Sequence, residues 1–92
     1  MNIKVRFYGV AYEQTGVRKW YPDLPEGSNV EGLLDLMVGE YPELQEMVFD
    51  ENVFRDYLAI SINNVDILGL DGVQTVLKDG DVVFVMPPIG GG

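Results

Sequence analysis

The sequence contains no cysteine and no histidine, and these two absences exclude much of protein chemistry. Without cysteine there is no disulfide framework, no thiolate nucleophile and no zinc–thiolate site. Without histidine the commonest general base and the commonest metal ligand are missing, which excludes a histidine-based hydrolytic triad. Any chemistry must therefore use carboxylates, hydroxyl groups, lysines or the end of the chain, and we expect no bound metal.

Positive charge is also scarce. The 92 residues include 6 Lys and Arg against 15 Asp and Glu, which gives a net charge of −9. Such a surface is repelled by nucleic acid and by anionic membranes, so we expect neither as a partner. An acidic surface suits a basic protein partner, because opposite potentials speed encounter. A plain contribution to solubility is the other interpretation.

Long apolar segments are absent as well, since no run approaches the ~20 residues needed to cross a membrane. The first five residues mix charged, polar and apolar groups, which is not the pattern of a signal peptide. We therefore expect a cytoplasmic protein. Hydrophobic residues make up 47% of the chain, enough for a folded domain, and the length suits one domain rather than two.

Two strands are predicted at the start of the chain. Residues 3–8 alternate with period two, which places Ile3, Val5 and Phe7 on one core-facing side. Residues 12–16 resemble a polar turn, and residues 17–24 predict a second strand. The two strands would form an antiparallel hairpin.

A helix is predicted next. Ser28 and Glu31 have the spacing of a capping box, in which each side chain bonds the other residue's backbone amide. Pro42 cannot continue a helix, so we expect the helix to stop around Glu40. The apolar residues at helical spacing on one face are Val30, Leu33, Leu34, Met37 and Tyr41.

The rest of the chain predicts more strands. Residues 42–56 are the least regular part, with a short helix around 44–48 and a turn at 50–52. Gly80 gives a strong turn within residues 78–81, because it adopts positive φ without steric cost. Strands are expected at 58–62, 65–68 and 82–86, with a turn at 63–64. This order predicts an α+β fold, a sheet of four to five strands with one main helix packed on one face.

The last sixteen residues carry a resemblance to a known family. Residues 77–92 read Leu-Lys-Asp-Gly-Asp, an apolar strand, Pro-Pro, Ile and three glycines. This segment resembles the terminal signature of MoaD/ThiS-type sulfur carriers, closest to MoaD, the small subunit of molybdopterin synthase. The first strand, Tyr41-Pro42 at the helix end and Ile62-Asn63 at a strand end are similar too. Each motif alone is common, and their conjunction at this spacing is specific.

The resemblance implies a fold and a division of the chain. It implies a mixed β-grasp (ubiquitin-like) sheet domain over residues 1–88, followed by a flexible glycine tail over residues 89–92. In this family the terminal carboxyl group, here that of Gly92, is adenylated with ATP and converted to a thiocarboxylate. The carrier would bind no permanent cofactor and would be a cosubstrate, not catalytic alone.

The same resemblance implies partners and a pathway. They are an E1-like adenylating enzyme, a sulfur donor enzyme and a MoaE-like large subunit of molybdopterin synthase. The thiocarboxylate would donate sulfur to the pterin precursor of molybdenum or tungsten cofactor. The alternatives are a ubiquitin-like modifier joined to lysines through Gly92, a sulfur carrier for tRNA thiolation or thiamine synthesis, and a binding module with an idle tail.

The composition of the tail suits this chemistry. Gly90, Gly91 and Gly92 have no Cβ, so the backbone can thread a narrow channel and approach a nucleotide closely. The rigid Pro87-Pro88 pair has few conformations to lose on binding and would aim the tail. From residue 88 to the end, the extended chain reaches on the order of 15 Å, enough to enter a neighbouring protein's pocket.

A docking surface is predicted beside the tail. If Val83 and Val85 face the helix, Phe84 and Met86 face outward, and Tyr8 joins them if the first and last strands are neighbours. An apolar patch there would meet the partners. The alternative is that Phe84 is a core residue and Met86 caps an edge. The predicted partner-binding residues are Tyr8, Phe84, Met86, Pro87, Pro88 and Ile89.

Three other candidate groups are weaker. Asp79 and Asp81 could bind a cation, but turn carboxylates are usually solvated. The acidic stretch 43–51 is similarly expected to be a solvated face. Trp20 and Tyr21 could form a ligand platform, although aromatic residues in strands usually pack.

Overall fold

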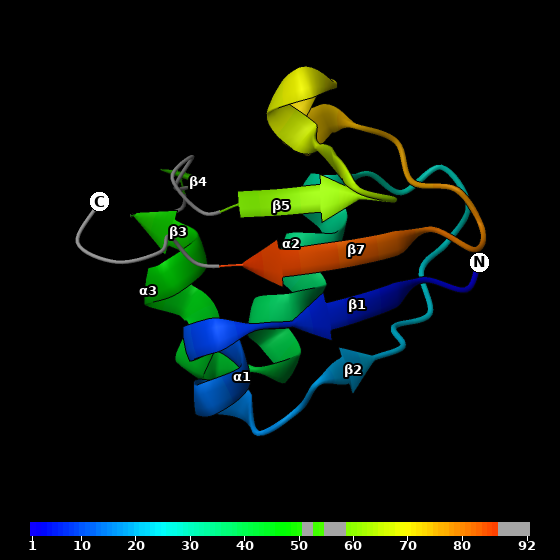
Figure 1. The fold of residues 1–92 in the computed structure, drawn as a ribbon. Helices are drawn as coiled ribbons and strands as arrows, with labels where there is room; N and C mark the ends of the chain where they lie inside the picture. The colour runs from blue at the N-terminus through cyan, green and yellow to red at the C-terminus, as the bar shows by residue number, and fades with distance from the viewer. Residues whose placement is uncertain (51–52, 55–58, 87–92) are drawn as a thin grey trace.

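The structure is a computed structural model, and it describes residues 1–50, 53–54 and 59–86. Its main feature is a five-stranded sheet in the order β2-β1-β7-β5-β6 (Figure 1). The central pair, β1 and β7, is parallel, and the other pairs are antiparallel. The sheet is therefore mixed. Its strands are β1 (Lys4–Phe7), β2 (Lys19–Trp20), β5 (Ala59–Ile62), β6 (Val65–Asp66) and β7 (Val82–Met86).

The main helix, α2 (Val30–Glu40), crosses behind this sheet (Figure 1). Its buried residues are Val30, Leu33, Leu34 and Met37, four of the five that the helical spacing predicts. The fifth, Tyr41, is the residue after the helix and is half-buried. The helix ends at Glu40, before Pro42, which confirms the expected stop. The smaller elements are α1 (Gly9–Thr15), η1 (Pro42–Leu44), α3 (Gln45–Val48), η2 (Ile67–Gly69), η3 (Gly72–Gln74) and a two-stranded sheet of β3 (Phe49–Asp50) and β4 (Val53–Phe54).

The core fills the space between the sheet and α2. Strands β1, β5 and β7 each bury alternate residues, so one face of the sheet is apolar and inward. In β7, Val83 is 0% and Val85 1% exposed. The short helix predicted near residue 44 is confirmed as η1 and α3, which bury Leu44 and Val48. A mixed sheet with one main helix on one face confirms the predicted β-grasp fold.

Two tight turns are also confirmed. Asn63 and Asn64 both have positive φ, a conformation that asparagine tolerates better than most residues. Gly80 has a φ of 88° in the turn before β7. The predicted domain end at residue 88, the tail 89–92 and parts of the predicted turn 50–52 and strand 58–62 lie outside the described residues.

The predicted turn over residues 12–16 is wrong. Residues 9–15 form α1, which buries Ala11 against the core. The Thr15 hydroxyl donates to the Ala11 carbonyl at 2.8 Å, and Gly16, at a φ of 70°, closes the helix. A short helix with one buried residue has no apolar periodicity to reveal it.

Two predicted strands are also shorter than expected. Of residues 17–24 only Lys19–Trp20 forms β2, with a single further bridge between Asn2 and Asp23. Of residues 65–68 only Val65–Asp66 forms β6. There the Asp66 carboxylate accepts from the Leu68 amide at 2.8 Å and starts a 3-10 turn, which ends the strand.

The predicted capping box is wrong as well. The residue that caps α2 is Asn29, whose Oδ1 accepts from the Gly32 amide at 2.9 Å. The Ser28 hydroxyl instead donates to the Pro25 carbonyl at 2.7 Å. Glu31 accepts from the Gln74 side chain at 3.5 Å. Asparagine and serine are about equally good N-cap residues, so residue type alone does not show which of Ser28 and Asn29 caps the helix.

Among the described residues, no helix is long and apolar enough to span a membrane.

Two neighbouring substitutions test which residue caps the helix. Asn29→Ala removes the acceptor for the Gly32 amide, so it should lower the free energy of unfolding by about 1 kcal/mol. The matched control, Ser28→Ala, removes an exposed hydroxyl that does not touch the helix, and should cost less than about 0.5 kcal/mol. Urea unfolding followed by circular dichroism measures both. A larger loss for Ser28→Ala would restore the capping box.

Candidate functional site

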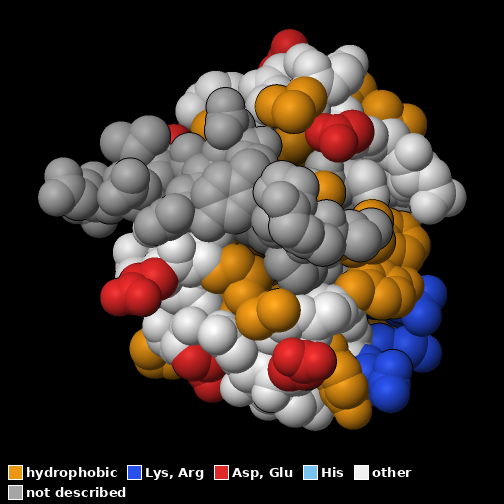
Figure 2. Space-filling view, turned by 60° about the vertical axis from the view of Figure 1, so that its left-hand side comes forward, with side chains coloured by type: hydrophobic (Ala, Val, Ile, Leu, Met, Phe, Trp, Pro, Cys, Tyr) orange, Lys and Arg blue, Asp and Glu red, His pale blue; other side chains and the backbone are white. Residues whose placement is uncertain are grey.

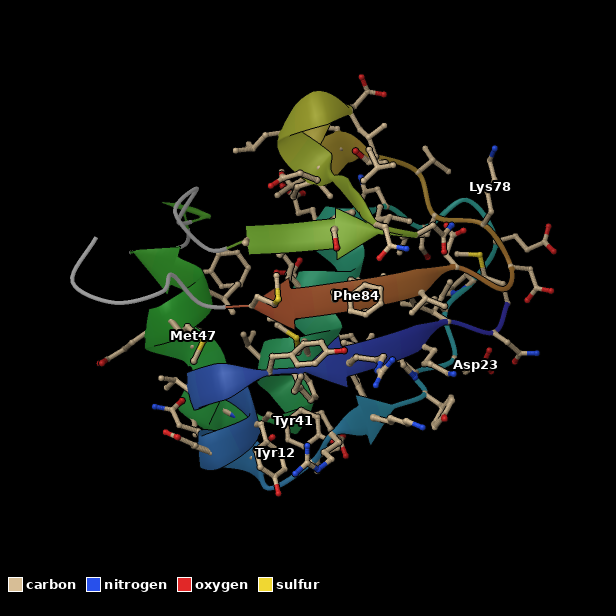
Figure 3. All side chains as sticks on the ribbon, viewed as in Figure 1. Tyr12, Asp23, Tyr41, Met47, Lys78 and Phe84 are labelled. Carbon is tan, nitrogen blue, oxygen red and sulfur yellow. The ribbon has the colours of Figure 1, made fainter. Side chains whose placement is uncertain are left out.

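The outer face of β7 carries two of the predicted docking residues. Phe84 is half-buried and Met86 is 41% exposed, while their neighbours in the strand are buried. Phe84 lies on the sheet face turned away from α2 (Figure 3). The interpretation of Phe84 as a core residue is therefore wrong, and the alternation places both side chains outward.

Tyr8 joins Phe84 because β1 and β7 are adjacent. Their parallel register sets Phe7 beside Val85, and the Tyr8 amide donates to the Val85 carbonyl at 3.2 Å. Tyr8 has extended backbone, so it continues the alternation of β1 one residue beyond the strand. Its ring stacks on that of Phe84, with centroids 5.9 Å apart and planes 16° apart.

A third residue completes this group and was not predicted. The guanidinium carbon of Arg6 lies 5.6 Å from the Tyr8 ring centroid and 5.7 Å from that of Phe84. Both distances are within cation–π range. The signal was present in the sequence, because Arg6 precedes Tyr8 by two residues and so shares its face. We call Arg6, Tyr8 and Phe84 the aromatic stack.

Small residues border the stack on its other side. In the β5–β7 register, Ser61 faces Phe84 and Ala59 faces Met86. Neither side chain is large enough to cover an aromatic ring, so the stack and Met86 form a partly open surface. Figure 2 shows hydrophobic side chains at this rim of the molecule beside a cluster of Lys and Arg. We call Arg6, Tyr8, Phe84 and Met86 the docking face.

The segment that leads to the glycine tail follows the docking face in the sequence. Met86 is the last residue of β7, and the next residue along the chain is Pro87. Pro87, Pro88, Ile89 and the three residues Gly90, Gly91 and Gly92 lie outside the described residues. The covalent chain nevertheless fixes one relation: Met86 is three peptide bonds from Ile89, the first residue of the tail.

The candidate cation site at Asp79 and Asp81 is a folded turn. The Asp81 carboxylate accepts from the Lys78 amide at 2.8 Å and from the Asn63 side chain at 2.9 Å. The Asp79 carboxylate accepts from the Asn2 amide at 2.6 Å. These oxygens hold backbone in place. No cluster of three or more metal-ligating side chains occurs within the described residues, and the described glutamates of the acidic stretch, Glu43 and Glu46, are exposed.

Trp20 is a packing residue, in agreement with the expectation for strand aromatics. Its ring lies 6.3 Å from that of Phe7 and edge-on to that of Tyr41 at 5.5 Å. Partial burial raises the pKa of the Tyr41 hydroxyl, and the nearby Glu40 and Glu43 carboxylates raise it further. Tyr21 is 65% exposed and takes no part in this cluster.

These features define a class of protein. A β-grasp domain presents a partly open aromatic face on its outer side, and in the sequence the strand that carries Phe84 and Met86 is followed by Pro-Pro-Ile-Gly-Gly-Gly. Residues 5–92 match the sequence profile of the ThiS family, so the chain belongs to that family of small ubiquitin-like sulfur carriers. Its members are not catalysts on their own, as the resemblance implied.

Two characterised relatives align over the full length of both chains. The molybdopterin synthase sulfur carrier subunit of Chlamydomonas reinhardtii is 32% identical over 92 residues. Small archaeal modifier protein 3 of Haloferax volcanii is 28% identical over the same length. The chain is therefore similar to sulfur carriers and to archaeal modifiers.

Solved structures show the same fold. SAMP1 from Haloferax volcanii superposes with a TM-score of 0.89, with all of both chains covered and 24% identity. A chain of the complex between subunits 1 and 2 of molybdopterin-converting factor from Helicobacter pylori has a TM-score of 0.63, 26% identity and full coverage of both chains. That second structure shows a fold of this kind engaged with a partner protein.

Neighbouring residues of β7 give a direct test of which face is open. Val85→Ala removes buried apolar surface and should lower the free energy of unfolding by about 2 kcal/mol. Met86→Arg alters an exposed side chain and should change the free energy of unfolding by less than about 0.5 kcal/mol. Urea denaturation measures both variants. Equal losses would place Met86 in the core and remove it from the docking face.

Proposed function

We propose that this protein is a sulfur carrier for molybdopterin synthesis, with the carboxyl group of Gly92 as its reacting group. The observation that supports the proposal most is that, in a member of the ThiS family, the strand that carries the aromatic stack is followed in the sequence by the glycine tail. A carrier needs both features. Its partner must hold the domain firmly while the chain end enters a separate active site.

The chemistry proceeds in three balanced steps. The Gly92 carboxylate, ionised at neutral pH, attacks the α-phosphate of ATP, and pyrophosphate leaves. The terminal sulfur of a persulfide on the sulfur donor enzyme attacks the acyl-adenylate carbonyl, and AMP leaves. A thiol then attacks the resulting acyl disulfide, which releases the thiocarboxylate and forms a new disulfide. The carrier supplies the carboxyl group, and its partners supply ATP binding, sulfur and the thiol.

The docking face would meet two partners in turn. An E1-like adenylating enzyme would hold it during activation, and a MoaE-like large subunit during sulfur transfer to the pterin precursor. The Helicobacter pylori complex and the 32% identical sulfur carrier subunit support a large synthase subunit as one of these partners. Because activation consumes ATP, we place the exchange in the cytoplasm. Using one face for both partners makes the complexes mutually exclusive, so the loaded carrier must leave the first enzyme.

A second candidate function has its own support. Small archaeal modifier protein 3 is 28% identical over the full chain. If a lysine amine rather than a persulfide attacks the acyl-adenylate, AMP leaves and an isopeptide bond joins Gly92 to the target. Both functions share the activation of Gly92 and differ in the nucleophile that follows.

Intact mass spectrometry tests the proposal. In this experiment the protein is to be incubated with a cognate adenylating enzyme, ATP and a sulfur donor. The expected product is heavier by the exchange of one oxygen for one sulfur, localised to Gly92. Deleting Gly92 should abolish the product and leave the unfolding midpoint unchanged, because the hydrophobic core is built from residues 3–85. Sulfur transfer by the deletion variant would overturn the proposal, and conjugates to lysine without a thiocarboxylate would favour the modifier.

The role of the docking face is tested in the same reaction. Phe84→Glu places a carboxylate beside an open apolar surface, so the KM for the carrier should rise about tenfold or more, because central aromatic residues dominate interfaces. The matched control is Val76→Glu, an exposed apolar residue outside the docking face. An equal effect of both variants, or none from Phe84→Glu, would remove the aromatic stack from the interface.

A further inference from the structure

The few positive charges of this acidic chain are gathered in one place. Four of the six Lys and Arg residues belong to the β1–β2 hairpin, namely Lys4, Arg6, Arg18 and Lys19. Figure 2 shows Lys and Arg side chains at one rim, while acidic side chains are spread over the rest of the visible surface. The local charge therefore differs in sign from the net charge of −9.

Three of these cations share the outer face of the sheet. Lys4 and Arg6 occupy the outward positions of β1, and Lys19 lies directly across from Arg6 in the antiparallel register. Strand geometry places all three within about 10 Å of one another. We call Lys4, Arg6 and Lys19 the basic strip. It adjoins the docking face, since Arg6 belongs to both.

The basic strip contains a pair of like charges that lowers the stability of the sheet. Like charges directly opposite each other in a sheet are destabilising, so the Arg6–Lys19 pair has a cost. None of the three cations forms a salt bridge with any other described residue, although the chain has 15 acidic residues. Within the part of the chain that the structure describes, no carboxylate therefore neutralises these three charges.

Arg6 is the best-placed of the three. Its contacts with the Tyr8 and Phe84 rings hold the guanidinium against both aromatic side chains of the docking face. A guanidinium held in this way can bind a carboxylate through two parallel hydrogen bonds, with less side-chain entropy left to lose. The neighbouring rings and Met86 would at the same time accept an apolar side chain.

We propose that the basic strip and the aromatic stack together bind an acidic surface of a protein partner, in which carboxylates flank an apolar side chain. The proposal goes beyond the proposed function and shares only the docking face with it. Salt screens charges beyond a Debye length of about 8–10 Å, so the strip decides the contact and the remote acidic residues do not. Three cations and a net charge of −9 are a poor match for the dense phosphates of nucleic acid.

A titration followed by amide NMR tests this surface directly. The probe is the acetylated, amidated peptide Glu-Leu-Glu-Leu-Glu, added to the ¹⁵N-labelled full chain at low salt. We expect shifts confined to β1, β2 and β7. In the triple variant Lys4→Gln/Arg6→Gln/Lys19→Gln, the Kd for the peptide should rise about tenfold. The rise is modest because each exposed ion pair between a cation of the strip and a glutamate of the peptide contributes little. The matched control Lys78→Gln alters an exposed lysine on the other side of β7 and should leave the Kd unchanged.

The controls separate the possible outcomes. A peptide with Gln in place of Glu should bind more weakly, by a similar factor, and added salt should remove the difference. Absence of shifts on these strands, or equal Kd values for wild type and the triple variant, would overturn the proposal. A single-stranded oligonucleotide that bound the strip more tightly than the peptide would also overturn it. The titration needs no activation of Gly92, so its result is independent of the sulfur-carrier proposal.

Discussion

The parallel pairing of β1 with β7 is the contact on which the rest of this molecule depends. It joins the first and last strands of the chain at the centre of the sheet, with Val5 beside Val83 and Phe7 beside Val85. Because alternate residues point to opposite faces, this single register creates two surfaces at once. The inward surface is the core under α2, and the outward surface is the aromatic stack. A slip of one residue would exchange them.

The parts of the fold that sequence predicts are those where a periodic pattern coincides with burial. The alternation in residues 82–86 and the helical spacing in residues 30–37 both report a face that packs on the core. The missed elements lack such a pattern. Helix α1 buries only Ala11, and the cap of α2 depends on which of two adjacent polar residues turns inward. Tertiary contacts decide both.

At the candidate site, too, the sequence predicts some features and not others. The outward positions of Phe84 and Met86 follow from their own strand, but the stacking of Tyr8 on Phe84 required the neighbours in the sheet to be known. The cation–π contacts of Arg6 add a distance that alternation alone does not supply. The role of the tail rests on the resemblance of residues 77–92 to the terminal signature of sulfur carriers, and it stays a prediction because residues 87–92 lie outside the described part of the chain.

The net charge of a sequence can differ in sign from the charge of one local surface. A net charge of −9 suggests a basic partner, yet the outer face of the sheet carries Lys4, Arg6 and Lys19. Net charge governs long-range repulsion, whereas contact energy is set by groups within a screening length. The hairpin concentrates cations on its outer face because β1 and β2 pair with Arg6 opposite Lys19. The same strand that completes the core therefore determines the sign of the potential on the outer face of the sheet.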